Sequence, residues 1–327
     1  IGVLAAATAF GKTVLGAYLI AEKKVNALVL VHNVEIMNNW IKDLSSFLTI
    51  NEELPTYTTP KGRVKKRSSL IGTFSSQKDS TTGIIDIAMI TSLGREDNIN
   101  ELVRNYGMVI VDECHHAAAV THENVLRAVT ARYVYGMSAT INRGDKQDKK
   151  MFMQLGPIRH RYTAKERAQK QGIGHYIYPR FTRLVDLNQS EDKNPSDYYR
   201  LIMQSELRNM QIVSDVIDCV KRGRTPVVMT KYKEHAQKLY DMLQGVADHV
   251  FLLQGGKSLK ERAAIREQMA AVRADESLVL VAIGQYVGEG FNYPRLDTML
   301  LAMPISFEGN VEQHAGRLNR DYEGKKD

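Results

Sequence analysis

Short apolar runs alternate with amphipathic segments through the first part of the 327-residue chain. The runs are nearly continuous in Val, Ile, Leu and Ala, which is typical of parallel strands that are covered on both faces. Amphipathic segments between them predict helices, the first at residues 14–23. The expected strands are Gly2–Ala7, Ala27–Val31, Ile84–Ile90, Met108–Val111 and Tyr133–Met137.

The clearest helical pattern follows the second expected strand. Its apolar positions recur at spacings of three and four, so they share one face of a helix. An α/β fold with a mainly parallel sheet is therefore expected, and ligands of such sheets bind at the carboxyl ends of the strands. The positions that define this helix are Met37, Trp40, Ile41, Leu44, Phe47 and Leu48.

The pattern weakens in the middle of the chain and then resumes. Residues 143–196 are polar and basic, with prolines as breakers, and we expect a connector there with a strand at 180–187. It separates a first domain, residues 1–142, from a second α/β domain, residues 197–327. The second domain is expected to contain a long helix Asp197–Lys221, strands Pro226–Thr230, His249–Leu253, Leu278–Ala282 and Thr298–Ala302, and helices Glu234–Leu243 and Leu259–Ala271.

The net charge of +7 and the isoelectric point near 9.2 favour a polyanionic partner. Basic residues concentrate at Lys61–Arg67, Arg143–Lys170 and Lys221–Arg224. Solvated loops rich in Lys and Arg explain such runs equally well, so charge alone does not decide.

Two cysteines are too few for a disulfide framework, which suits a cytoplasmic location. Cys114-His115-His116 could begin a metal site, but no second ligand cluster completes it, so zinc is not expected. No apolar run approaches the roughly 20 residues that span a bilayer, and no membrane partner is expected.

Residues 5–13 read AAATAFGKT and join the first strand to the first helix, which is the arrangement of a phosphate-binding loop. Backbone N–H groups would bind phosphates, Lys12 would reach the β- and γ-phosphates, and Thr13 would ligate Mg²⁺. A helix start with a capping Thr is the alternative. The loop has Ala where the pattern usually has Gly. The nucleotide-binding candidates here are Ala9, Phe10, Gly11, Lys12 and Thr13.

Residues 108–116 read MVIVDECHH and place two carboxylates where a strand ends. Asp112 would hold the same Mg²⁺ as Thr13, and Glu113 would orient or deprotonate the attacking water. A polar strand end is the alternative. The two motifs in this order indicate an NTP-hydrolysing site.

Near the end of the sequence, Gln313, Arg317 and Arg320 lie within nearly two helical turns. Two guanidinium groups there can point at a common anion. An arginine delivered to the γ-phosphate accelerates hydrolysis by on the order of 10³ to 10⁵ in known systems. A basic surface helix would be the simpler interpretation if the stretch stood alone.

The ordered set AFGKT, DECHH, GMSAT, VGEGFNYPRLDT and QHAGRLNR resembles superfamily 2 DNA and RNA helicases with two RecA-like domains. The sequences of these motifs and of the segments around them are similar to the XPB-type and restriction-subunit-like branch, including helicases of phage-defence systems. The resemblance implies ATP and Mg²⁺ as cofactors, and a catalytic role for His116 beside Glu113. It implies coupling of hydrolysis to domain closure by Ser138, Ala139 and Thr140, and a nucleotide contact by Gly290.

The same resemblance implies a motor cycle in which ATP closes the two domains and hydrolysis releases them. Each domain would hold a nucleic-acid strand through its phosphates, with DNA favoured over RNA. Ordinary strand-end caps are the alternative for each contact. The candidate contacts are His32, Thr91, Ser92, Lys231, Gly255 and Gly256.

Three classes of function stay open. They are a nucleic-acid-stimulated ATPase that translocates on DNA, a motor subunit of a restriction or defence complex, and a binding module without ATPase activity. The third is motivated by Ala9 and by Asn292, which stands where relatives commonly have Asp. No nuclease-like cluster is evident, so cleavage would need a partner nuclease domain or subunit. The sequence begins in the first strand without Met, and we expect it to be a fragment of a longer protein.

Overall fold

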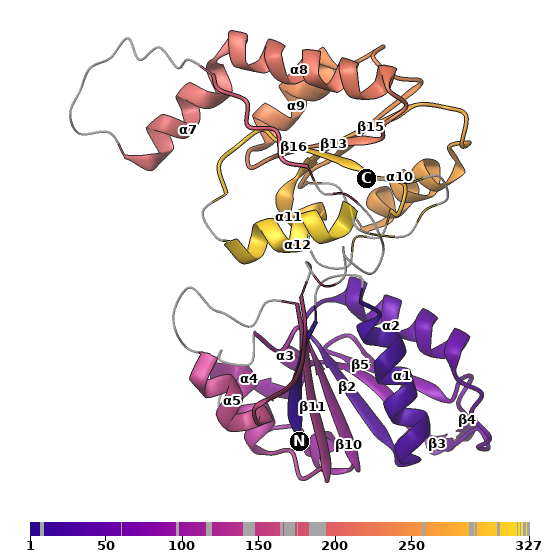
Figure 1. Ribbon diagram of the computed structural model, residues 1–327. Coiled ribbons are helices and arrows are strands. Elements are labelled where there is room, and N and C mark those ends of the chain that lie inside the picture. The colour runs from indigo at the N-terminus through magenta and orange to yellow at the C-terminus, as the bar shows by residue number, and fades with distance from the viewer. Residues whose placement is uncertain are drawn as a thin grey trace. The chain divides into compact units, whose positions relative to one another are not determined.

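We describe the protein from a computed structural model of residues 1–327. Its tertiary contacts divide the chain into two units, Ile1–Arg167 and Ala168–Asp327. Each unit is built around a sheet flanked by helices (Figure 1). The structure describes the backbone of Gln313 but not its side chain. The structure describes every residue except 7–9, 60, 96–97, 116–119, 140–147, 164–165, 167–173, 175, 183–193, 257–258, 288–290, 292, 306–307, 319, 321, 323–324 and 326–327.

Unit 1 contains an eight-stranded sheet with the order β12-β1-β11-β10-β2-β7-β5-β6. Neighbouring strands pair in parallel, except that β5 and β6 form an antiparallel pair. Strand β2 is buried along its whole length and β10 at its first four residues, which explains their continuous apolar sequences. The strands are β1 (Gly2–Ala6), β2 (Ala27–Val31), β5 (Ile71–Ser75), β6 (Lys78–Asp79), β7 (Ile85–Met89), β10 (Met108–Asp112), β11 (Tyr133–Ser138) and β12 (Ile158–Tyr162).

Helices cover both faces of this sheet. One buried cluster joins α1 and α2 to one face, and a second joins α3, α4 and α5 to the other (Figure 1). Two small hairpins complete the described part of unit 1, β3 (Thr56–Thr58) with β4 (Val64–Lys66) and β8 (Gly94–Arg95) with β9 (Asn98–Ile99). The helices are α1 (Lys12–Lys23), α2 (Val34–Phe47), α3 (Ile90–Leu93), the 3₁₀ helix Glu101–Arg104, α4 (Val120–Arg127) and α5 (Asp148–Leu155).

Unit 2 repeats the architecture on a smaller scale. Its four-stranded sheet has the order β14-β15-β13-β16, and all neighbours are parallel. Helices α8 and α9 pack on one face, and α10 and α11 pack on the other. The elements are α7 (Pro195–Gln204), α8 (Glu206–Lys221), β13 (Pro226–Thr230), α9 (Lys233–Met242), β14 (His249–Leu253), α10 (Leu259–Ala271), β15 (Leu278–Ile283), α11 (Gly284–Val287), β16 (Thr298–Leu301) and α12 (Glu308–Leu318).

The single long helix expected at residues 197–221 is wrong, because two helices occupy this segment. Ser205 ends α7 and begins α8 with an extended backbone, φ −64° and ψ 104°. Its hydroxyl accepts a hydrogen bond from the backbone N–H of Arg208, which caps the second helix. The apolar pattern continues from α7 into α8, so the sequence did not indicate that one helix ends and another begins at Ser205.

Part of the expected connector contributes to unit 1. Helix α5 buries Met151 and Leu155, and β12 pairs in parallel with β1 at the edge of the sheet. Strand β12 reads IRHRY and is largely exposed, so it has no apolar run to reveal it. Most of the strand expected at 180–187 lies outside the described residues, and the exact domain limits stay a prediction. Within the described residues, no helix is both long and apolar enough to cross a bilayer.

Candidate nucleotide-hydrolysis site

The sheet order of unit 1 brings three sequence motifs to one edge. Strands β1, β11 and β10 are neighbours, and parallel strands end at the same edge of a sheet. The chain leaving β1 leads to Lys12, β11 ends at Ser138, and β10 ends at Asp112. Residues that lie more than a hundred positions apart are therefore adjacent in space.

Helix α1 begins directly after the loop. Gly11 is its N-cap and has φ 92° and ψ 35°, a left-handed conformation that favours glycine. No side chain caps this end, so the first N–H groups of the helix have no intrahelical acceptor and face outward. Lys12 and Thr13 are the first two helical residues. The ring of Phe10 packs against Tyr162 with centroids 4.8 Å apart, and Ala9 lies outside the described residues.

The carboxylates after β10 are held in a defined geometry. Glu113 has φ 45°, an uncommon conformation for a residue with a side chain, and its backbone N–H donates to Asp112 Oδ1 at 2.9 Å. Trp40 Nε1 donates to Asp112 Oδ2 at 2.8 Å. Burial raises the pKa of the Asp112 carboxyl, and Glu113 raises it further, whereas Lys12 and the Trp40 hydrogen bond lower it.

A polar network links these residues. Lys12 Nζ lies 3.4 Å from Glu113 Oε1, with the two side chains only 14% and 11% exposed. The Ser138 hydroxyl donates to Glu113 Oε2 at 3.3 Å and lies 2.9 Å from His115 Nδ1. The structure thus brings together Lys12, Asp112, Glu113 and Ser138. Ala139 follows at the strand end, and His116 and Thr140 lie outside the described residues.

Sequence reasoning missed two members of this site. Trp40 was counted only as an apolar position of α2, and His115 was considered only as a metal ligand. A buried indole needs an acceptor for its N–H, so a tryptophan in a core helix is itself a signal for a polar partner. Nothing in the local sequence indicates that the partner is Asp112, which is 72 positions away.

The candidates of unit 2 cluster around one backbone carbonyl. Arg317 Nη1 donates to Phe291 O at 3.2 Å, and Arg320 Nη2 donates to the same oxygen at 3.3 Å. The two guanidinium groups therefore converge on one acceptor, although Arg320 lies beyond the end of α12 at Leu318. Burial, and then Arg317, lower the pKa of His314 to about 4. Gly290 and the side chain of Gln313 lie outside the described residues.

The expected nucleic-acid contacts of unit 1 follow strands β2 and β7. His32 Nε2 lies 3.0 Å from Asn33 Nδ2, and Thr91 is exposed. Ser92 Oγ accepts from the backbone N–H of Ser76 at 3.0 Å, so this hydroxyl stabilises a neighbouring turn.

In unit 2 the expected contacts follow strands β13 and β14. Lys231 Nζ lies 4.5 Å from the ring centroid of Tyr199. Gly255 is half-buried, and Gly256 is exposed with φ 95°. Their contact with nucleic acid stays a prediction.

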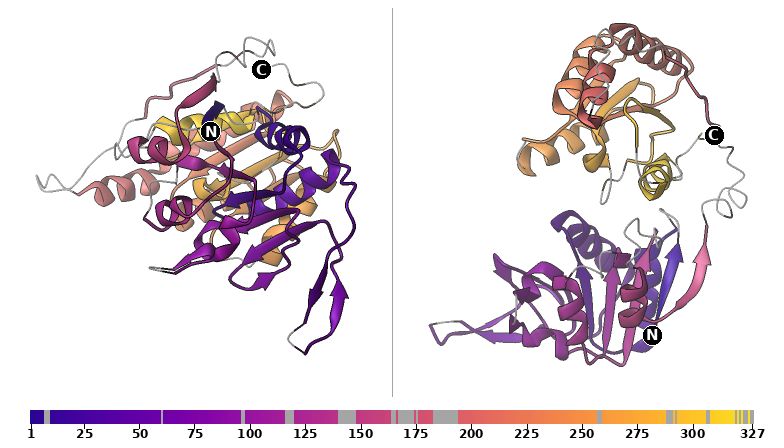
Figure 2. Two further views of the ribbon diagram at one scale, coloured as in Figure 1. Left: turned by 90° about the horizontal axis from the view of Figure 1, so that it is seen from below. Right: turned by 90° about the vertical axis from the view of Figure 1, so that its left-hand side faces the viewer.

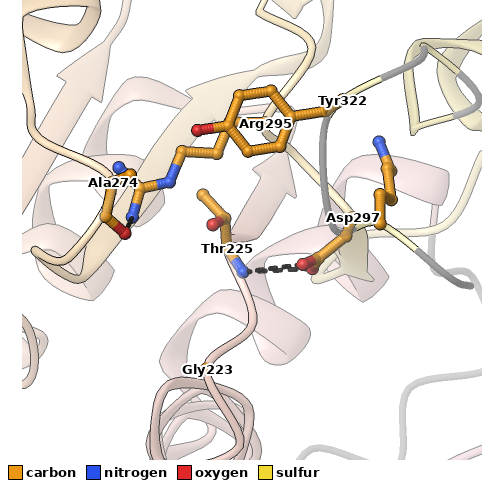
Figure 3. Close-up of a pocket in the computed structure, with 7 residues that line it drawn as sticks. Gly223, Thr225, Ala274, Arg295, Asp297 and Tyr322 are labelled. Carbon is orange, nitrogen blue, oxygen red and sulfur yellow. Dashed lines mark hydrogen bonds between the residues drawn. The ribbon is translucent and has the colours of Figure 1, made fainter.

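A cavity of about 410 Å³ lies elsewhere in unit 2 (Figure 3). Its polar groups bind the protein's own backbone. Asp297 accepts from the backbone N–H of Thr225 at 3.0 Å, Arg295 donates to the carbonyl of Arg273 at 2.9 Å, and Lys325 donates to the carbonyl of Pro294 at 3.0 Å. We assign this cavity a structural role.

Comparison with known proteins shows what the chain resembles. The model of the family described as type III restriction enzyme, res subunit, matches residues 1–143. Transcript termination protein A18 of Fowlpox virus (strain NVSL) is 24% identical over 332 residues, covering 96% of this chain and 66% of that protein. Probable helicase D10 of Escherichia phage T5 is 24% identical over 331 residues, covering 97% and 64%. The chain is therefore similar to restriction-subunit and helicase proteins of superfamily 2.

Solved structures support a fold of two RecA-like domains. The Pyrococcus furiosus Hef helicase domain matches with a TM-score of 0.58 at 13% identity, covering 97% of this chain and 90% of that chain. The restriction-modification enzyme LlaBIII bound to DNA matches with a TM-score of 0.60 at 13% identity, covering 99% and 26%. The chain spans slightly less than two thirds of the length of the first two viral relatives.

Proposed function

We propose that this protein is a superfamily 2 motor, a nucleic-acid-stimulated ATPase that translocates on DNA and couples hydrolysis to that movement. The observation that carries the proposal is the cluster at the end of the first sheet. Lys12, Asp112 and Glu113 meet there beside the uncapped start of α1. A lysine, two carboxylates and the first N–H groups of a helix without a side-chain cap are the set of groups that a magnesium-bound triphosphate requires.

The residues present fit ATP and Mg²⁺. The N–H groups at the start of α1 and the Lys12 ammonium would hold the phosphates, and the Thr13 hydroxyl and Asp112 carboxylate would hold the metal. When bound, Mg²⁺-ATP supplies a γ-phosphoryl group that is transferred to water. Trp40 keeps one oxygen of Asp112 in place, because its N–H donates to that oxygen.

Glu113 is the proposed base that orients or deprotonates water. Its two oxygens have different partners, since Oε1 faces Lys12 and Oε2 accepts from Ser138. Ser138 also contacts His115, so a shift of the end of β11 would change the surroundings of the Glu113 carboxylate. This link supports the coupling role proposed for Ser138, Ala139 and Thr140, with His116 as a further catalytic candidate.

Unit 2 is proposed to supply Arg317 and Arg320 as stabilisers of the developing phosphate charge, with Gln313 beside them. The support is their convergence on one acceptor, the carbonyl of Phe291. Guanidinium groups that already share an acceptor are preorganised for an anion. Gly290 and the strand-end residues named above complete the proposed nucleotide and nucleic-acid contacts.

DNA is proposed as the track in preference to RNA. LlaBIII was solved bound to DNA, and the archaeal relative DNA 3'-5' translocase XPB2 is 22% identical over 52% of this chain. A cytoplasmic location is part of the same proposal. A motor subunit of a restriction or defence complex is the second candidate, favoured by the res-subunit family model over residues 1–143. That role would require a partner nuclease.

The test is phosphate release from ATP without nucleic acid and with duplex DNA, single-stranded DNA or RNA. Lys12→Ala is the site variant, and Lys42→Ala, an exposed lysine of α2, is the matched control. The proposal expects DNA-stimulated hydrolysis in the wild type and in Lys42→Ala and none in Lys12→Ala. Hydrolysis that does not depend on Lys12, or a protein that binds DNA and never hydrolyses ATP, would refute it.

A further inference from the structure

The hairpin of β3 and β4 stands apart from the core of unit 1. It extends away from the sheet as a two-stranded ribbon (Figure 2). The backbone pairs continuously from Arg67 N with Pro55 O to Thr59 N with Arg63 O, both at 2.8 Å. Gly62 turns the chain with φ 73°. The ribbon is therefore well formed although it buries almost nothing.

The hairpin is strongly basic. Residues 56–67 include five cations and no carboxylate. Lys61, Arg63, Lys65 and Lys66 are exposed. No ion pair joins any of the five cations to another residue within the described part of the chain. The cations are Lys61, Arg63, Lys65, Lys66 and Arg67.

Most of this charge lies on one face of the ribbon. Side chains alternate between the faces of a strand, so Arg63, Lys65 and Arg67 share a face, with about 7 Å between neighbours. Tyr57 pairs with Lys65 and lies on the same face. The guanidinium of Arg67 covers its ring at 4.2 Å from the centroid. Lys66 lies on the opposite face.

The stability of unit 1 accounts for Arg67 in part, because its Nη1 donates to the backbone carbonyl of Asp79 at 3.4 Å, but it does not account for the other four cations. Strand β4 is exposed at all three residues, and even Val64 is 69% exposed. Lysines on exposed strands also prevent aggregation between sheet edges, but that purpose does not require one charged face. Three cations in a row on one face complement a line of phosphates.

We propose that the Arg63-Lys65-Arg67 face of this hairpin binds the phosphate backbone of duplex DNA, as a grip separate from the strand-end contacts of the motor. The inference rests on the proposed function. A two-stranded ribbon fits the roughly 12 Å wide major groove of B-form DNA, whereas the major groove of an RNA duplex is deep and narrow. Binding of unpaired bases needs open aromatic faces, and Arg67 covers one face of Tyr57.

The test measures DNA affinity of the whole chain by fluorescence anisotropy across a series of salt concentrations, without ATP. Arg63→Gln/Lys65→Gln removes two charges from the proposed face. Lys149→Gln/Lys150→Gln removes two exposed charges from α5 and serves as the control. Duplex DNA, single-stranded DNA and duplex RNA of equal length form the three arms.

We expect Arg63→Gln/Lys65→Gln to weaken duplex DNA binding roughly tenfold at about 100 mM salt. The slope of log affinity against log salt should become about 2 units less steep, because about 0.9 counterion is released per phosphate contact. The α5 control should differ from the wild type by less than about twofold. The single variants Lys65→Gln and Lys66→Gln refine the result, since only the first should reproduce part of the loss.

Equal affinities for the hairpin variant and the control would overturn the inference, as would a greater loss on single-stranded DNA or duplex RNA. A greater loss on single-stranded DNA or duplex RNA would point to a different track. Equal affinities would point to edge protection or a protein partner as the purpose of the cations. Failure of the proposed function is distinguishable, because it appears as a lack of Lys12-dependent hydrolysis in a chain that still binds DNA. A wild-type chain that binds no DNA would refute both.

Discussion

Replacing Gly16 by alanine is predicted to destabilise unit 1, because the absent side chain leaves room for the Trp40 ring. It lies in α1 against the indole of Trp40, which is fully buried. A Cβ atom at Gly16 would stand 2.8 Å from Trp40 Cζ3 and closer still to Cη2. The ring cannot simply turn away, because its Nε1 donates to Asp112.

Two opposing effects set the magnitude. In an ordinary helix interior, Gly→Ala stabilises by about 1 kcal/mol. Here either the ring stays and the packing strains, which costs about 1–3 kcal/mol, or the ring moves and a hydrogen bond to a carboxylate is lost, which costs about 1.5–3 kcal/mol. Gly16→Ala should therefore destabilise unit 1 by about 1 kcal/mol net, and should slow hydrolysis if the ring moves away from Asp112.

The chain contains one tryptophan, so fluorescence-detected urea unfolding reports directly on unit 1. The control is the pair Trp40→Phe and Gly16→Ala/Trp40→Phe, followed by far-ultraviolet circular dichroism. The smaller ring leaves space for the methyl group, so the alanine should cost less in this background. A Gly16→Ala protein that is more stable than the wild type and hydrolyses ATP normally would refute the reasoning.

Two further predictions concern the base and a buried histidine. Glu113→Gln should lower ATP hydrolysis at least 10²-fold yet keep ATP binding, because Lys12 loses its carboxylate partner and stays available for phosphates. Parallel ATP-binding and phosphate-release assays check this prediction, and unchanged turnover would contradict it. His235, which contacts Thr230 and Asn209, has its pKa lowered to about 4 by burial and then by Arg208 and Lys238. The unfolded state then binds more protons between pH 6.5 and 4, so stability falls by about 3 kcal/mol as the pH drops through this window. His235→Gln should reduce the loss of unfolding free energy between pH 6.5 and 4, and the similar loss that His314 contributes should remain. An unaltered dependence of unfolding free energy on pH would disprove the assignment of this loss to His235.

Local sequence determined the elements and their chemistry. The runs at 27–31 and 226–230 predicted β2 and β13 because strands buried on both faces are apolar at nearly every position. Gly11-Lys12-Thr13 and Asp112-Glu113 were identified because each motif is short, and a backbone that passes from strand to helix presents such residues at the strand end.

Only the tertiary structure decided how these elements combine. Strand β11 lies between β1 and β10, and this order places Ser138 within hydrogen-bonding distance of Glu113. The exposed strand β12 joins the same sheet through backbone hydrogen bonds, which leave no mark in its side chains. The bond from Trp40 to Asp112 depends on the packing of α2 against the sheet. Periodicity and motifs predict the secondary structure and the chemistry of a single segment. The pairing of distant segments is set by the free energy of the whole packed unit.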